Sequence, residues 1–140
     1  MSSGLLVDVT GGRLQGIASR GLRFWRGIPY AAPPVGELRL RAPRPVVPWT
    51  GVRDAAAFGP ASPQDRRSLT VATGTGDPQS EDSLTLNVIA PPTASERLRP
   101  VMVYVHGGAY AVGSSREMPG QGEGLVHDAG AAVRVESRPA

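Results

Sequence analysis

The chain has 140 residues, a formal net charge of +3 and no cysteine, and all 15 of its basic residues are arginine. Without cysteine it has neither disulfides nor thiolate metal sites, and its scattered arginines argue against a nucleic-acid-binding face. Leu, Ile, Val and Phe make up about 22% of the residues, close to the ~20% level below which a chain struggles to form a core. We therefore expect one unit, globular in style, that is part of a larger fold.

The first twelve residues, "MSSGLLVDVTGG", contain only three consecutive large apolar residues. That is too few for a signal peptide, and no segment approaches the ~20 apolar residues of a membrane span. We expect a soluble, cytoplasmic chain with no membrane span and no nucleic-acid partner.

The first half of the chain predicts strands followed by irregular structure. A strand over 5–10, the turn Gly11-Gly12 and a returning arm over 13–18 form the pattern of a hairpin. Prolines are frequent over 29–63, which predicts an extended surface arm without helix or sheet. The small and polar segment 66–80 predicts a mobile loop.

The second half predicts alternating strands and helices. "LTLNVIAPP" predicts a strand from Leu84, with Leu84, Leu86 and Val88 on one face. "PVMVYVHGG" is a nearly continuous β-branched run, typical of a strand covered on both faces. The helix-like "GEGLVHDAG" and a valine-containing run near Val133 follow. The fold class is therefore α/β, with antiparallel leading strands followed by the start of a mixed sheet.

The turn after this strand, His106-Gly107-Gly108, suggests an anion site because consecutive main-chain N–H groups at a turn form an anion-binding concavity. A phosphate-binding loop of the P-loop type requires a lysine after its second glycine, and the chain has no lysine. The remaining candidate is the transient oxyanion of an ester under attack. A tight turn without further function is the alternative.

Three blocks carry a family resemblance: "FWRGIPYAAPPVGELRLRAPRPVVPWTGVRDAAAFGPASPQ", "SEDSLTLNVIAP" and "PVMVYVHGGAYAVGSS". In order and spacing they resemble the N-terminal third of the type-B carboxylesterase and lipase family, relatives of the cholinesterases with an α/β-hydrolase fold. The likeness covers about residues 5–130. It implies a serine hydrolase of small-molecule carboxylic esters that needs no cofactor or metal.

The resemblance also assigns roles at the turn. It implies that the main-chain N–H groups of Gly108 and Ala109 help form an oxyanion hole, that Gly107 belongs to the turn, and that His106 is structural and not the general base. Small side chains are needed there because a larger one would hold the substrate carbonyl away from the N–H donors, which must lie about 2.7–3.1 Å from the oxyanion. Two cysteines that pair in the family correspond to Ser62 and Ser83 here, which agrees with a reducing compartment.

The nucleophile, acid and base of such an enzyme are missing. The family's serine lies in a G-x-S-x-G elbow, which neither Ser19 in "IASRG" nor Ser115 in "GSSRE" matches. Residues 131–140 are atypical, because Arg134 and Glu136 interrupt an expected buried run. We expect 1–140 to be an N-terminal fragment from a truncated or frameshifted frame, inactive alone. A catalytically inactive binding protein, like the adhesion relatives of cholinesterases, and a non-functional product remain as alternatives.

Other chemistry-bearing residues have structural interpretations. Glu81 and Asp82 are adjacent, so on a strand they point to opposite faces, and a salt bridge or turn cap is favoured over a catalytic pair. His127 is expected on a solvated helix face. Trp25, Tyr30 and Trp49 are expected to pack in the core, with a wall of an acyl pocket as the alternative.

Overall fold

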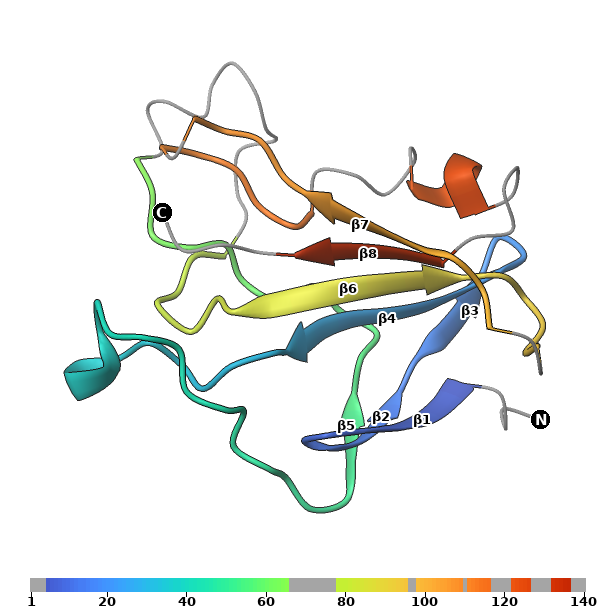
Figure 1. The fold of residues 1–140 in the computed structure, drawn as a ribbon, viewed down its shortest axis with the longest axis horizontal. Helices are drawn as coiled ribbons and strands as arrows, with labels where there is room; N and C mark the ends of the chain where they lie inside the picture. Colours follow the sequence, from blue (N-terminus) through green and yellow to red (C-terminus); the bar gives the residue numbers. More distant parts are fainter. Residues whose placement is uncertain are drawn as a thin grey trace.

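The structure, a computed structural model, describes residues 5–65, 78–95, 98–109, 111–116, 122–126 and 132–136, the last range by its backbone only. The described strands form two sheets (Figure 1). One has three strands in the order β1-β2-β5, and the other has five strands in the order β3-β4-β6-β8-β7.

The smaller sheet begins with the predicted hairpin. β1 (Leu6–Val9) pairs antiparallel with β2 (Gly12–Gln15), and β5 (Val52–Asp54) adds parallel to β2. The prediction of no helix or sheet over 29–63 was therefore wrong at β5 and at a short 3-10 helix, Gly36–Leu38. Val52 and Arg53 are both exposed, so this short strand lacks the apolar alternation from which a half-buried strand is recognised.

The predicted return arm over 13–18 is divided between the two sheets. β2 ends at Gln15, and β3 (Ile17–Ser19) pairs antiparallel with β4 (Leu22–Pro29) of the larger sheet. Gly16, between them, is buried, and a Cβ there would lie 2.5 Å from the carbonyl oxygen of Phe24. The chain thus passes from one sheet to the other at a point too crowded for a side chain.

The larger sheet is mixed, as predicted. β4 pairs antiparallel with β6 (Thr85–Ala90), and β6 pairs antiparallel with β8 (Ala132–Glu136). β8 pairs parallel with the edge strand β7 (Val101–Val105). β8 therefore forms and occupies an inner position despite the charged residues Arg134 and Glu136.

β4 joins two core clusters because neighbouring residues on a strand point to opposite faces. Phe24 packs with Leu22, Ile89 and Val126, the last from the helical turn 122–126. Trp25 faces the other way and packs with Leu14 of the smaller sheet. An irregularity in pairing between Trp25 and Ile28 places both in this second cluster.

β7 departs from its prediction of cover on both faces. Four of its apolar side chains are exposed: Val101 (61%), Met102 (44%), Val103 (52%) and Val105 (40%). β8 pairs with β7 on one side, and the described part of the chain places no strand on the other. The apolar pattern is that of a strand inside a larger sheet, and the described residues do not supply the cover.

Candidate functional site

The candidate site lies where β7 ends. His106 follows the last strand residue, and the turn runs to Gly113. Because β7 and β8 are parallel, their carboxyl ends lie at the same edge of the sheet (Figure 1). Open α/β sheets bind ligands outside the carboxyl ends of their strands, so this turn occupies the edge at which a ligand is expected.

The backbone of the turn has two consecutive residues with positive φ. Gly108 has φ of 121° and Ala109 has φ of 52°. A Cβ built on Gly108 would lie 1.7 Å from the carbonyl oxygen of Val112, whereas one built on Gly107 would meet nothing within 4 Å. Glycine is therefore required at position 108, both by its positive φ and by the lack of space for a side chain. Neither reason applies at position 107.

Hydrogen bonds within the turn close it, but several of its main-chain N–H groups donate to no described residue. The carbonyl oxygen of Gly108 accepts from the N–H groups of Ala111 and Val112, each at 3.0 Å, which closes the turn. Within the described ranges, no hydrogen bond is donated by the N–H of Gly107, Gly108 or Ala109. Ala109 is exposed and Gly108 is half-buried. Adjacent main-chain donors with no internal acceptor can receive an anion.

His106 is engaged with the turn itself. Its Nδ1 lies 2.7 Å from the carbonyl oxygen of Gly107, so a proton on Nδ1 lets the ring donate to the neighbouring residue. Its Nε2 is buried and has no hydrogen-bond partner among the residues that the structure describes. The structural role expected for His106 stays a prediction.

Two side-chain amides that sequence reasoning did not single out hold the far end of the turn. Gln64 exchanges two hydrogen bonds with the main chain of Gly113, at 3.0 and 2.9 Å. Asn87 donates to the carbonyl oxygen of Ser115 at 3.1 Å. One signal was present in the sequence: Asn87 is a polar residue within the otherwise apolar run "LNVIA".

Glu81 and the three aromatic residues make the structural contacts expected of them. Glu81 forms a salt bridge with Arg39 at 2.9 Å. Trp25 is buried, and Tyr30 and Trp49 pack against the same cluster. These contacts confirm the predicted salt bridge and core packing.

The two serines that the resemblance places at paired cysteine positions are both buried, Ser62 at 6% exposure and Ser83 at 1%. They line the same small hollow, beside Arg39 and Glu81. The structure thus brings these two positions together.

Ser115 is almost fully buried (4%), with its carbonyl oxygen bound by Asn87. This agrees with its interpretation as a loop residue.

His127, the segment 127–130 and most of the predicted loop 66–80 lie outside the described residues. The described ranges contain no group of three or more His, Cys, Asp and Glu side chains able to hold a metal ion. None of the described helical segments has the length and apolar character needed to cross a bilayer.

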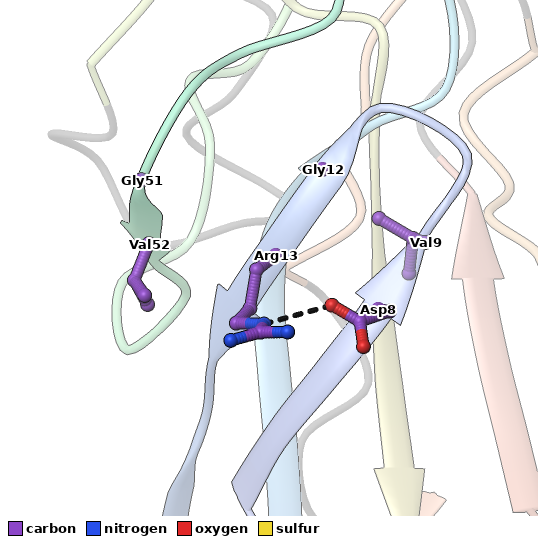
Figure 2. A pocket seen from close by; sticks show the side chains of 6 residues that line it. All are labelled: Asp8, Val9, Gly12, Arg13, Gly51 and Val52. Atoms are coloured by element: carbon purple, nitrogen blue, oxygen red, sulfur yellow. Dashed lines mark hydrogen bonds and ion pairs between the residues drawn. The ribbon is translucent and has the colours of Figure 1, made fainter.

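A groove between the β1–β2 hairpin and β5 is the other hollow of note (Figure 2). Asp8 and Arg13 form an ion pair at 2.8 Å on its wall, and both side chains are exposed. The hydrogen bond and charge of Arg13 lower the pKa of Asp8. An exposed ion pair of this kind contributes little stability. Because Asp8 and Arg13 bond to each other, we do not take this groove as the candidate functional site.

Known proteins match most of the chain. The sequence profile of the carboxylesterase family matches residues 3–132. The chain is 41% identical over 128 residues to the para-nitrobenzyl esterase of Bacillus subtilis, covering 86% of this chain and 26% of that protein. It is 46% identical over 112 residues to the phenmedipham hydrolase of Pseudarthrobacter oxydans, covering 78% of this chain and 22% of that protein.

Solved structures agree. A structure of PNB esterase superimposes with a TM-score of 0.88 at 39% identity, covering 96% of this chain and 27% of that one. The chain thus has the N-terminal portion of the carboxylesterase α/β-hydrolase fold and spans about a quarter of the length of its relatives. On the matching profile and on these relatives, the chain belongs to the carboxylesterase family.

Proposed function

We propose that this chain supplies the oxyanion-binding turn of a carboxylic ester hydrolase. The observation that carries the proposal is the pair of adjacent N–H groups, on Gly108 and Ala109, that donate to no described residue at the carboxyl end of β7. Membership of the carboxylesterase family supports an ester as the substrate.

The turn would act when a nucleophile attacks the ester carbonyl. As the new bond to carbon forms, negative charge moves to the carbonyl oxygen, and preorganised donors at about 2.7–3.1 Å stabilise that charge more than they stabilise the neutral carbonyl. In this fold a further N–H comes from the residue after the nucleophile. The nucleophile, acid and base match no described residue of this chain, so the polypeptide that completes the fold must supply them.

The experiment joins residues 5–130 to the remaining part of the B. subtilis para-nitrobenzyl esterase, in place of the aligned segment. Hydrolysis of a p-nitrophenyl ester is then measured. Replacing Ala109 by lactic acid exchanges the main-chain N–H for an ester oxygen and leaves the side chain unchanged. We expect kcat to fall about 10²- to 10³-fold, the loss typical of one oxyanion donor.

The matched control is glycolic acid in place of Gly107, which removes the neighbouring N–H. We expect this change to have little effect on kcat. A folded chimera without activity would contradict the proposed function, and equal losses at Gly107 and Ala109 would show that the donors are wrongly assigned.

A further inference from the structure

We infer that Gln64 and Asn87 are positioning residues of the oxyanion turn, which they hold through the main chain of Gly113 and Ser115. This inference rests on the proposed function for its effect on rate. The contacts themselves are independent of that function. Their printed bonds to the turn segment reach Gly113 and Ser115 and not the candidate donors Gly108 and Ala109, so their action is indirect.

The first link is between the turn and Gly113. The N–H groups of Ala111 and Val112 bind the carbonyl oxygen of Gly108, and the carbonyl oxygen of Val112 occupies the place that a Cβ on Gly108 would take. The position of Gly108 is therefore tied to the position of residues 112 and 113. A displacement of Gly113 moves the candidate donors with it.

The second link is between Gly113 and Gln64. The side-chain amide donates from Nε2 to the carbonyl oxygen of Gly113 at 3.0 Å, and its Oε1 accepts from the Gly113 N–H at 2.9 Å. Nε2 also donates to the carbonyl oxygen of Ser62 at 3.0 Å. Both amide hydrogens are thus used, which fixes the orientation of the amide. Only a carboxamide offers this combination of donors and acceptor.

Asn87 makes a similar link at Ser115. It is 3% exposed on the inner strand β6. Its Nδ2 donates to the carbonyl oxygen of Ser115 at 3.1 Å, and its Oδ1 accepts from the N–H of Gly27 at 3.0 Å. Asn87 therefore connects the segment after the turn to β4 and β6, the best-packed strands of the sheet. A buried amide with two main-chain partners is costly to replace.

Gln64→Glu tests the inference with an almost isosteric change. The introduced carboxylate cannot donate to the carbonyl oxygens of Gly113 and Ser62, and it places negative charge against them. Gln15→Glu is the matched control, because Gln15 is also half-buried but lies in β2 of the other sheet and donates to the adjacent Gly16. Both variants are made in the active chimera described above.

We expect Gln64→Glu to lower kcat about tenfold or more at pH 8, since displacing a catalytic group by ~1 Å costs up to about 10²-fold. KM should change much less, and amide hydrogen exchange should become faster over 108–113. In acid the introduced carboxyl becomes protonated and again presents one donor and one acceptor. The ratio of kcat between Gln64→Glu and Gln15→Glu should therefore rise as the pH falls from 8 to 5.

Three results would overturn the inference. They are unchanged exchange over 108–113 in Gln64→Glu, faster exchange with unchanged kcat, and equal losses in the two variants at every pH. Failure of the proposed function would be seen in a different experiment. The parent chimera would then be inactive, or its kcat would not respond to lactic acid at Ala109, before either glutamine is changed.

Discussion

The two adjacent glycines of the turn provide the sharpest test of its geometry. Gly107→Ala and Gly108→Ala add the same methyl group one residue apart. The structure places that methyl in open space at 107, but 1.7 Å from the carbonyl oxygen of Val112 at 108. Real Cβ contacts are almost never shorter than 3.0 Å, so the turn must open by more than an ångström in the second variant. The positive φ of Gly108, 121°, adds conformational strain.

The expected loss of kcat in Gly108→Ala follows from the narrow range of distances over which an oxyanion donor acts. An oxyanion donor acts only over a range of about 2.7–3.1 Å, which is narrower than the displacement that the methyl demands. We expect Gly108→Ala in the chimera to lose about 10²-fold in kcat or more, roughly 2.7 kcal/mol of transition-state stabilisation, with a smaller change in KM. Gly107→Ala should stay within about threefold of the parent, as for a substitution that touches nothing.

The assay is initial-rate hydrolysis of a p-nitrophenyl ester, with the melting temperature of each variant measured alongside. Equal melting temperatures with unequal kcat values would assign the loss to the site and not to unfolding. If Gly108→Ala retained kcat within threefold of the parent, or if Gly107→Ala were the more damaging change, the reasoning from the contact with Val112 would be wrong.

Three further predictions concern the 140-residue chain itself. It should show no esterase activity above buffer, because no serine of the chain lies in the G-x-S-x-G elbow expected of the nucleophile, and activity abolished by Ser115→Ala would contradict this. Val103→Asp should reduce aggregation measured by light scattering, because it charges the apolar edge strand; Val52→Asp, at a similarly exposed valine of the other sheet, should do so much less. Ser62→Cys with Ser83→Cys should form a disulfide under oxidising conditions and stabilise the chain by up to about 3 kcal/mol, whereas two free thiols by mass spectrometry after alkylation would show that the side chains do not meet.

Much of the fold follows from local pattern. Strands β1 and β6 lie where apolar residues recur at strand spacing, and the Gly11-Gly12 turn produces the first hairpin. The parallel pairing of β5 with β2 was not predictable in this way, because it is set by long-range contact. Trp49 is part of that contact, since its Nε1 donates to the carbonyl oxygen of Arg13 at 3.0 Å. A partner 36 residues away leaves no periodic signal in the sequence.

The exposure of β7 follows from the expectation that the chain is part of a larger fold, and not from the local pattern. The apolar run 101–105 reports the environment in a larger sheet, and local pattern cannot say whether the covering layers are present. The relatives are about four times longer than the matched segment. The mismatch between the apolar character of β7 and its exposure is therefore what a partial fold predicts.

The candidate site shows the same division between local and long-range determinants. The glycines and the closing hydrogen bonds of the turn lie within seven residues, 107–113, and a motif can identify them. Its placement relative to the sheet depends on Gln64, 49 residues from Gly113, and on Asn87, 28 residues from Ser115.

These long-range bonds have a consequence for folding. Asn87 bonds simultaneously to Gly27 of β4 and to Ser115, so we expect the segment after the turn to take its place only where β4 and β6 are paired. Electrostatic stabilisation of an oxyanion depends on donors that need not reorganise during the reaction. The proposed oxyanion role of the turn thus depends on the core formed by β4 and β6, and the turn sequence alone, transferred to another loop, would lack its hydrogen bonds to Gln64 and Asn87.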